Sequence, residues 1–372
     1  MTKRIGIDAR FYGPTGKGIG RYTQKLIEHL EKLDSNNEYF VFLNQEGFDS
    51  CQPMSPGWHK VLVNIPWYCV KEQLVLPKTL NQYHLDLMHF LHFNVPLFYR
   101  GKFVVTVHDL IHLKFNPRGS THPLVKYLIK YWLYRLVSAS AIGRSSQIIT
   151  VSEFVKKQII DYYKVDPKKI NVTYEANFMS LNNQCLKMKN SNLAIHTPYL
   201  LYVGNAYPHK NLEKLLTTFK TICSTENIYL VLVGKKDYFY QSLANMAKNL
   251  GLENKVIFVG QAGDDDLPGL YQNALAYIFP SLMEGFGLPG LEAMAHNCPV
   301  LSSNAGSLSE IYGAAALYFN PEKASEIIKA IQIIIHNPEQ QEKLKKLGQE
   351  QIKKYSWDNC AQKTLDIYKK SC

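Results

Sequence analysis

The chain has 372 residues, of which 46% are hydrophobic and 20% are charged, a composition typical of folded globular proteins. This length exceeds what one ordinary hydrophobic core organises, so we expect two domains. The seven cysteines are scattered without a Cys-x-x-Cys pair, which argues against a disulfide framework and a zinc site and favours a reducing cytoplasm. The apolar runs are too short for a signal peptide or a transmembrane helix, so we expect a cytoplasmic protein, soluble or peripheral to a membrane.

The net charge of +11 is concentrated in the first half of the chain. Residues 1–180 hold 23 Lys and Arg residues against 14 Asp and Glu residues, whereas residues 181–372 hold 19 against 17. A basic first half favours an anionic membrane surface, an anionic substrate or nucleic acid. Charge that serves only solubility is the alternative.

Short β-rich runs alternate with amphipathic helical segments along the whole chain. In the first half, helices are expected after Gly20 and over residues 122–142 and 153–163, between strands at 4–9, 38–44, 85–90, 102–109 and 146–152. In the second half, helices over 211–223 and 237–250 are expected among strands at 198–204, 228–234, 255–260, 275–281, 299–304 and 316–319. This alternation predicts parallel sheets covered on both faces, and therefore two doubly wound, Rossmann-like α/β domains.

The domain boundaries follow from a polar stretch near the middle of the chain. We expect an N-terminal domain over residues 1–181, a linker over 182–198 and a C-terminal domain over 199–355. A last helix, within residues 356–372, is expected to pack back on the N-terminal domain. Ligands of doubly wound folds bind at the carboxyl ends of the strands, so we expect a site in a cleft between the two domains.

Two places in the first half carry candidate binding residues. Gly13, Gly16, Gly18 and Gly20 precede a helix, where backbone amides can approach an anion, although a tight turn without a ligand explains them equally well. His108 ends the fourth predicted strand and is expected to point into the cleft, with a capping or core histidine as the alternative.

In the second half, Lys210 lies in the turn between a strand and a helix. A lysine there neutralises phosphate as a point charge, whereas the alternative is a solvated lysine beside an N-capping asparagine, Asn211.

The segment SLMEGFGLPGLEAMA places two carboxylates on either side of a glycine-rich turn. Gly285 and Gly287 leave backbone amides open to a phosphate at a helix N-terminus, and Pro289 suits the first helical turn. Glu292, early in the helix, is suited to a vicinal diol, and Glu284, in the loop, is suited to a second hydroxylated ring. A sugar, a diphosphate and a ribose together make a nucleotide sugar.

These residues match a known family pattern. Glu284 and Glu292 form the Glu-x7-Glu pattern, and PVLSSNAGSLSEI follows it. Other matching segments along the chain are HDL, IITVSEF, YVG…HKN and VIFVGQ. In these motifs the chain resembles retaining glycosyltransferases of the GT-B fold, specifically glycosyltransferase family 4. It looks most like the mannosyltransferases that build bacterial cell-surface polysaccharides. The resemblance therefore implies transfer of mannose from GDP-mannose to a glycan or lipid-linked glycan acceptor, without nucleic acid as a partner.

The resemblance also implies that the N-terminal domain binds the acceptor and the C-terminal domain binds the nucleotide sugar, and it implies roles for individual residues. Glu284 would hold the hydroxyls of the donor sugar, His108 would contact that sugar, and Lys210 would stabilise the leaving diphosphate. The other donor-binding positions are the ribose-binding Glu292, the amides around Phe286, Gly287 and Leu288, and Gly16 and Gly18 of the other domain. Relatives usually carry an arginine where this chain has Asn205 or His209, so His209 is expected to supply part of the missing charge.

The implied mechanism is front-side attack through an oxocarbenium-like state, with no cofactor and no metal. Lys210 and helix dipoles take the place of a metal, and we reject Asp264–Asp266 of GDDDLP as an Asp-x-Asp metal motif because this segment follows VIFVG, where the family's nucleotide base lies. The alternatives are a nucleotide-sugar-binding regulator, a sugar phosphorylase or epimerase of the same architecture, or a transferase that uses a UDP- or dTDP-sugar.

Basic and aromatic residues alternate in the segment 122–144. It contains Lys126, Tyr127, Lys130, Tyr131, Trp132, Tyr134, Arg135 and Arg144, a mixture that suits a membrane interface. We expect weak contact of the N-terminal domain with anionic membranes, with packing of the helix against its own sheet as the alternative.

Overall fold

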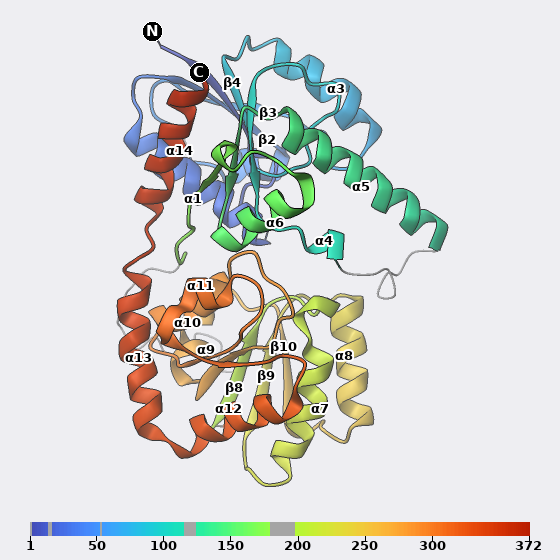
Figure 1. The fold of residues 1–372 in the computed structure, drawn as a ribbon, viewed down its shortest axis with the longest axis vertical. Coiled ribbons are helices and arrows are strands. Elements are labelled where there is room, and N and C mark those ends of the chain that lie inside the picture. Colours follow the sequence, from blue (N-terminus) through green and yellow to red (C-terminus); the bar gives the residue numbers. More distant parts are fainter. Residues whose placement is uncertain (1, 14–16, 53, 115–123, 179–197) are drawn as a thin grey trace. The chain divides into compact units, whose positions relative to one another are not determined.

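The computed structural model describes residues 2–13, 17–52, 54–114, 124–178 and 198–372 (Figure 1). The chain forms two compact units, the first made of Met1–Glu175 and Ser356–Cys372 and the second of Ala176–Tyr355. The expected linker, apart from Pro198 at its end, lies outside the described residues. Within the described part of the chain, no helix combines the length and apolar character needed to span a bilayer.

The first unit is built on a parallel seven-stranded sheet with the order β3-β2-β1-β4-β5-β6-β7. Its strands are β1 (Arg4–Asp8), β2 (Glu38–Leu43), β3 (Trp58–Leu62), β4 (Leu87–Phe90), β5 (Phe103–Val107), β6 (Gln147–Thr150) and β7 (Ile170–Val172). The sequence did not predict β3 and β7, so His108 follows the fifth strand and not the fourth. Both missed strands lie at the sheet edges, where half-exposed positions and, in β7, a length of three residues weaken the hydrophobic pattern.

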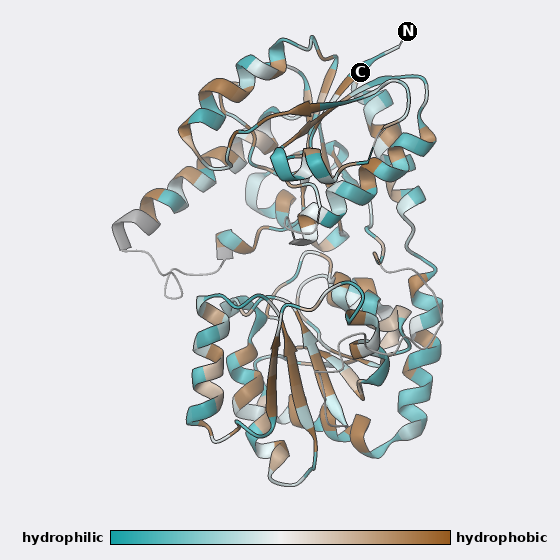
Figure 2. Ribbon diagram, turned by 180° about the vertical axis from the view of Figure 1, so that it is seen from behind, coloured by the Kyte–Doolittle hydropathy of each residue, from teal (hydrophilic) through white to brown (hydrophobic). Residues whose placement is uncertain are grey.

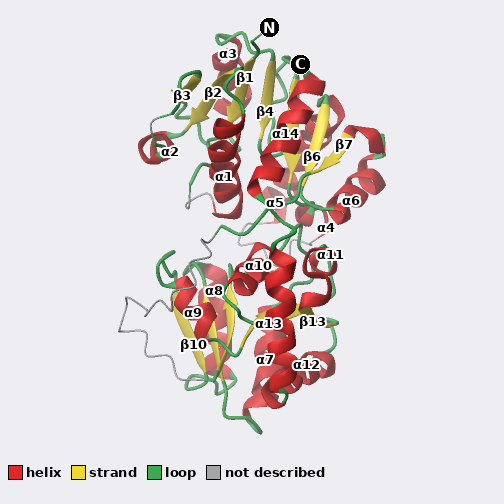
Figure 3. Cartoon of the chain, turned by 90° about the vertical axis from the view of Figure 1, so that its left-hand side faces the viewer, coloured by secondary structure: helices red, strands yellow, loops and turns green. Residues whose placement is uncertain are grey.

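Seven helices are described in the first unit (Figure 1). They are α1 (Lys17–Leu33), α2 (Gln45–Ser50), α3 (Val70–Asn81), α4 (Ile111–Lys114), α5 (Leu124–Arg144), α6 (Glu153–Tyr163) and α14 (Trp357–Ser371). The last helix, α14, packs against α1, the first helix of the chain (Figure 3). The sequence did not predict α3, because the internal Pro77 and the exposed Val70 and Leu74 obscure its helical pattern.

The second unit contains a parallel six-stranded sheet with the order β10-β9-β8-β11-β12-β13. Its strands are β8 (Tyr199–Val203), β9 (Tyr229–Val233), β10 (Val256–Gly260), β11 (Ala276–Phe279), β12 (Val300–Ser303) and β13 (Ala316–Phe319), all of them predicted. Its helices are α7 (Leu212–Cys223), α8 (Tyr238–Asn249), α9 (Leu267–Asn273), α10 (Leu288–Ala295), α11 (Leu308–Tyr312), α12 (Ala324–His336) and α13 (Pro338–Ile352). The prediction of two Rossmann-like domains is confirmed.

In both units the strands of the sheet form the hydrophobic core, and Figure 2 shows these strands as predominantly hydrophobic. Central positions such as Val104 and Leu200 are fully buried, because helices cover parallel sheets on both faces. In each sheet the chain order reverses at one place, between β1 and β4 in the first unit and between β8 and β11 in the second. Doubly wound folds bind their ligands at the carboxyl ends of the strands beside such a switch point.

Candidate active site

A buried ion pair lies at the switch point of the second sheet. Lys210 ends the short 3-10 helix Pro208–Lys210 that follows β8, and Glu284 lies in the loop that follows β11. Because β8 and β11 are neighbours, Lys210 Nζ reaches Glu284 Oε1 at 2.6 Å. The side chains are only 13% and 10% exposed, so this pair is shielded from bulk water. The sequence identified both residues, but it did not predict their contact.

The backbone around Lys210 is fixed by the residue that follows it. Asn211 adopts a left-handed conformation (φ 60°) and its side-chain amide donates to the carbonyl oxygens of Pro280 and Pro321 at 3.2 and 2.9 Å. Asn211 therefore precedes α7 but does not cap it through its side chain, and the alternative of a solvated lysine beside a capping asparagine is wrong. A further bond, from Leu282 N to His209 O at 2.8 Å, ties the Lys210 turn to the Glu284 loop.

The Glu284 loop is held from the segment that follows β12. Ser307 donates to Glu284 O through both its backbone N–H (3.2 Å) and its hydroxyl (3.1 Å). Gly306 has φ +69°, and a Cβ atom there would lie 2.7 Å from Glu284 N, so this close approach requires glycine. The sequence motif included Gly306 and Ser307 without a role for them. Their role is to position Glu284.

The turn between Glu284 and α10 has the geometry expected for a helix start. Gly287 is the N-cap of α10 with φ +103°, and Pro289 lies in the first helical turn. Tyr312 Oη donates to Gly287 O at 2.5 Å, and burial together with the Glu284 carboxylate raises the pKa of Tyr312 well above its ordinary value. Tyr312 therefore stays a protonated donor. Phe286 is buried, with its ring edge-on to Tyr355.

Glu292 lies on α10, and its side chain is buried. Its Oε2 atom accepts a hydrogen bond from Tyr271 Oη at 3.2 Å, and its backbone carbonyl accepts one from the His296 ring at 2.8 Å. The ring of His296 stacks on Tyr271, with centroids 5.8 Å apart. Tyr271 was not identified from the sequence. A tyrosine in the helix before β11 gives no signal that it contacts a carboxylate 21 positions later.

The two positions that depart from the family pattern shape the turn after β8. Asn205 Oδ1 accepts from Tyr207 N at 3.4 Å, and the Asn205 carbonyl accepts from Tyr202 Oη at 2.7 Å. The ring of His209 lies edge-on to Tyr207, 6.1 Å away. That His209 supplies charge to a ligand stays a prediction.

In the first unit, His108 lies just after β5, and the structure gives both of its ring nitrogens acceptor partners. Nδ1 lies 3.1 Å from Glu175 Oε1, and Nε2 lies 3.0 Å from Leu91 O. These two contacts fix the orientation of the His108 ring. Glu175 was missed, because its only sequence signal is a carboxylate shortly after the unpredicted strand β7.

The glycine loop before α1 is described only in part. Gly16 lies outside the described residues, whereas Gly18 lies in the first turn of α1. Among the described residues, its Cβ position has no neighbour within 4 Å apart from the adjoining residues and the backbone of its own helix. Ser152 is the N-cap of α6 and accepts from Val155 N at 3.2 Å.

Two Rossmann-like units, with paired charges at the switch point of the second, define a glycosyltransferase of the GT-B architecture. Residues 186–351 match the family model described as Glycosyl transferases group 1, and residues 16–176 match the one described as Glycosyltransferase Family 4. The chain belongs to this glycosyltransferase family, as its motifs predicted.

The similar proteins extend over most of the chain. It is 32% identical to the O-antigen chain mannosyltransferase RfbU of Salmonella typhimurium over 266 residues, which are 70% of this chain and 71% of the relative. It is 28% identical to the O-antigen chain mannosyltransferase B of Escherichia coli over 372 residues, which are 95% of this chain and 96% of the relative. The solved structure of sucrose-phosphate synthase from Thermosynechococcus elongatus shares the fold, with a TM-score of 0.79, 19% identity and coverage of 99% and 98% of the two chains.

Proposed function

We propose that this glycosyltransferase moves mannose from GDP-mannose to a lipid-linked glycan, with retention of the anomeric configuration, during cell-surface polysaccharide synthesis. The observation that carries the proposal is the buried Lys210–Glu284 pair at the switch point of the second sheet. The names of the two mannosyltransferase relatives support mannose as the transferred sugar.

The pair suits the bond that a nucleotide sugar must break. An ammonium group has three N–H donors and a carboxylate has two oxygens, so Lys210 and Glu284 each keep capacity beyond the bond at 2.6 Å. In the proposed complex, Lys210 donates to the diphosphate and Glu284 accepts from the sugar hydroxyls. The Lys210–Glu284 ion pair, which has no net charge, then contacts both the diphosphate and the sugar, the two groups joined by the scissile C–O bond.

In the proposed complex, the other site residues bind the phosphates, the ribose and the sugar of the donor. Gly287 and Leu288, at the N-terminus of α10, bring backbone amides and the positive end of the helix toward phosphate. Glu292 accepts from the ribose diol. In the first unit, the family resemblance assigns Gly18 to the diphosphate and the His108 ring, which Glu175 and Leu91 O hold in place, to contact with the donor sugar.

The proposed reaction needs no protein nucleophile. The C1–O bond to the diphosphate breaks as the acceptor oxygen attacks the same face of an oxocarbenium-like sugar, and the departing phosphate oxygen takes the acceptor's proton. The main catalytic task is therefore to stabilise negative charge on the leaving diphosphate, which is the role of Lys210.

The test is a donor screen with the purified full-length protein. We expect acceptor-dependent release of GDP from GDP-mannose, and much slower release of nucleotide from UDP-glucose, UDP-N-acetylglucosamine and dTDP-rhamnose. Release of nucleotide from one of those three donors instead would show that the transferred sugar is not mannose. A protein that binds GDP-mannose without release in the presence of any acceptor would be a regulator. Phosphorolysis or epimerisation without an acceptor would identify a sugar phosphorylase or a nucleotide-sugar epimerase.

We expect transfer to persist in excess EDTA, because Lys210 and the α10 N-terminus supply the positive charge that a metal would otherwise provide. The measurement is the initial rate of GDP release before and after chelation, with and without added Mn²⁺. Loss of activity in EDTA with recovery in Mn²⁺ would contradict this prediction and would make Asp264–Asp266 a candidate metal site.

We also propose that α5 contacts an anionic membrane. Its exposed apolar side chains line a shallow groove together with Arg135. They are Leu128, Ile129, Trp132, Leu133 and Leu136, between 44% and 62% exposed. The Arg135 guanidinium lies 5.0 Å from the centre of the Trp132 ring. Apolar side chains beside interfacial tryptophan and arginine suit the boundary between lipid head groups and acyl chains.

Two residues of the sequence-based membrane hypothesis do not face solvent. Arg144 donates to the carbonyl oxygens of Tyr99 and Pro96 at 2.6 and 3.0 Å, and Tyr134 packs its ring against Phe93. Both bind the helix to the body of its own unit, because they lie on the face of α5 turned toward the core. The side chains of Lys126 and Tyr127 lie outside the described residues.

Binding to vesicles tests the membrane contact. We expect co-sedimentation with anionic vesicles at low salt, weaker binding at high salt, and a clear loss of binding in Trp132→Ser. Tyr238→Ser, which removes an aromatic ring that is 67% exposed in the second unit, is the matched control and should bind as the wild type does. Equal sedimentation with neutral and anionic vesicles would refute the proposed electrostatic attraction between α5 and anionic lipid.

A further inference from the structure

The ring of His108 packs against a buried tyrosine of α1. Tyr22 is fully buried and lies edge-on to the His108 ring, with centroids 4.7 Å apart and planes at 86°. This edge-to-face geometry is a favoured arrangement of two aromatic rings. Glu175 Oε1 and Leu91 O contact the two ring nitrogens of His108, so the Tyr22 ring adds a third contact. Residues from three separate parts of the chain therefore define the position of the His108 ring.

Tyr22 is itself held by the last helix of the chain. Its ring packs against Trp357, the first residue of α14, with centroids 5.9 Å apart, and Trp357 is buried. The next residue of α14, Asp358, binds α1 through its Oδ1 atom, which lies 2.6 Å from His29 Nδ1 (Figure 3). The rings of Trp357, Tyr22 and His108 thus form a continuous series of contacts from the start of α14 to the end of β5.

A buried chain of hydrogen bonds fixes the position of α14 along the sheet. Tyr368 Oη lies 2.6 Å from Nδ1 of His89, on β4, and His89 Nε2 lies 2.8 Å from Oγ1 of Thr106, on β5. The Thr106 hydroxyl in turn lies 3.4 Å from the hydroxyl of Tyr22. These four residues are at most 1% exposed. Burial, with His108 nearby, lowers the pKa of His89 to about 3, so its neutral ring has one nitrogen that donates and one that accepts. Because buried polar groups are costly without partners, a shift of α14 along the sheet is unfavourable.

The residues around His108 also flank both connections of the chain between the two units. Glu175, which contacts His108 Nδ1, is the last residue of the first unit before the chain enters the second. Trp357, which contacts Tyr22, is the second residue after the chain returns to the first unit. The surroundings of His108 are therefore complete only when the returning segment, α14, is in place.

We infer that Tyr22 and Trp357 are positioning residues for His108. The contacts run from α14 through Trp357 and Tyr22 to the His108 ring, and the hydrogen bonds of Tyr368 and His89 keep α14 in the position that these contacts require. In the proposed reaction His108 contacts the donor sugar, so Tyr22 and Trp357 act on the transfer step through His108. This kinetic consequence rests on the proposed function, whereas the hold on the ring does not.

The first test replaces Tyr22 by leucine, which removes the ring that packs on His108. We expect kcat to fall about tenfold, with a smaller change in the donor KM, because misplacing a group that contacts the reacting sugar affects the transition state most. Trp357→Leu should lower kcat in the same way, and Tyr22→Phe, which keeps the ring, should retain most of the activity. The matched control is Tyr99→Leu. It removes a buried ring that packs on Phe103 at the start of β5, the opposite end of that strand from His108, and should leave kcat unchanged.

A double-variant cycle separates positioning from general packing. His108→Gln keeps an amide that can contact the donor sugar and is expected to leave measurable turnover. If Tyr22 acts through His108, Tyr22→Leu lowers kcat in the wild type and has little further effect in His108→Gln. An equal loss in both backgrounds would mean that Tyr22 only stabilises the core, and would overturn the inference. A thermal melt accompanies each variant, and Trp357→Leu takes the place of Tyr22→Leu in the cycle if the latter does not fold.

A spectroscopic measurement requires no turnover. In the full-length protein labelled with ¹⁵N at its histidines, the signals that vanish in His108→Gln are those of the His108 ring. We expect these nitrogen resonances, which respond to hydrogen bonds at the ring nitrogens, to shift in Tyr22→Leu and Trp357→Leu and to stay in place in Tyr99→Leu. If the wild type transfers no sugar but the resonances shift, the proposed function fails and the positioning role stands. If transfer occurs and the resonances stay in place in both variants, the positioning role is refuted and the transferase stands.

Discussion

Replacing Lys210 by alanine lowers kcat about 10²–10³-fold, because the leaving diphosphate loses its one positioned ammonium group in a water-poor site. Glu284→Ala is expected to abolish measurable turnover, since the donor sugar loses its hydroxyl acceptor and Lys210 loses its partner at 2.6 Å. The measurements are steady-state kcat with the donor identified in the screen, and a thermal melt of each variant. Both variants should still unfold cooperatively.

The double variant Lys210→Ala/Glu284→Gln tests whether the two residues act together, because Glu284→Gln retains an oxygen that can accept from the sugar hydroxyls and is expected to leave measurable turnover. If they act together, the loss of activity in the double variant is far smaller than the product of the losses in the two single variants. The control is Lys353→Ala, which breaks the ion pair with Glu350 at 2.7 Å, where the side chains are 66% and 69% exposed. An unchanged kcat in Lys210→Ala with a normal melt would refute the assignment of Lys210 to the leaving group.

Replacing Arg10 by alanine lowers the free energy of unfolding by about 3–5 kcal/mol, the usual effect of removing one partner from a buried ionic group. The Asp8 and Glu72 side chains, 8% and 0% exposed, would then be left without their cation. Urea unfolding of the full chain measures this loss.

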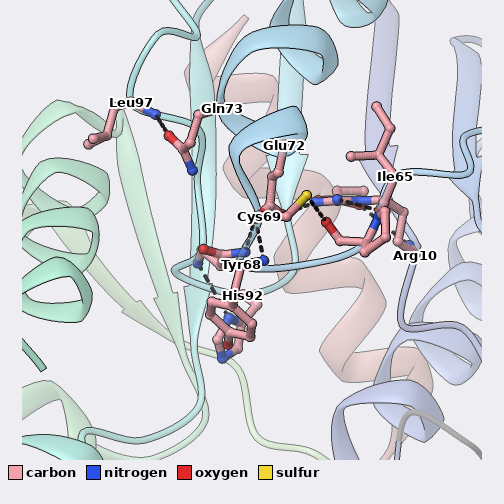
Figure 4. A network of polar contacts seen from close by, with 11 residues as sticks. Arg10, Ile65, Tyr68, Cys69, Glu72, Gln73, His92 and Leu97 are labelled. Carbon is pink, nitrogen blue, oxygen red and sulfur yellow. Dashed lines mark hydrogen bonds and ion pairs between the residues drawn. The ribbon is translucent and has the colours of Figure 1, made fainter. Parts of the chain in front are cut away.

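The matched control for Arg10 is Arg4→Ala, at the start of β1, the strand that precedes Arg10. Arg4 pairs with Glu38 at 3.3 Å, but the two side chains are 41% and 36% exposed, so its loss should cost at most about 1 kcal/mol. If Arg10→Ala were as mild as Arg4→Ala, the buried ion pairs of Arg10 with Asp8 and Glu72 would not stabilise the first unit (Figure 4).

The sequence predicted the elements of the fold better than their contacts. The buried strands of the second sheet are continuous apolar runs and were all found, whereas β3 was missed because its pattern is half exposed at an edge. The motif placed Glu284 and Lys210 on loops at the carboxyl ends of strands, because strand alternation fixes those ends. Their pairing required knowing that β8 and β11 are neighbours, and this order is set by packing of the whole sheet.

The contacts of the first unit were harder to predict for the same reason. His108 was identified, but its partner Glu175 lies 67 positions away, beyond a three-residue strand. Arg10 and Glu72 have no sequence pattern that separates them from surface charges, although both are almost fully buried. Burial of charge depends on partners that only the folded chain brings together.

The position of α14 has a consequence for biosynthesis. This helix belongs to the first unit, packs on α1, and places Tyr368 Oη 2.6 Å from the buried His89 ring, yet the whole second unit precedes it in the chain. Domains of most chains fold in the order in which they emerge. Here the first unit lacks α14 while all of Ala176–Tyr355 is translated, so the unit that is begun first is completed only after the second has been synthesised.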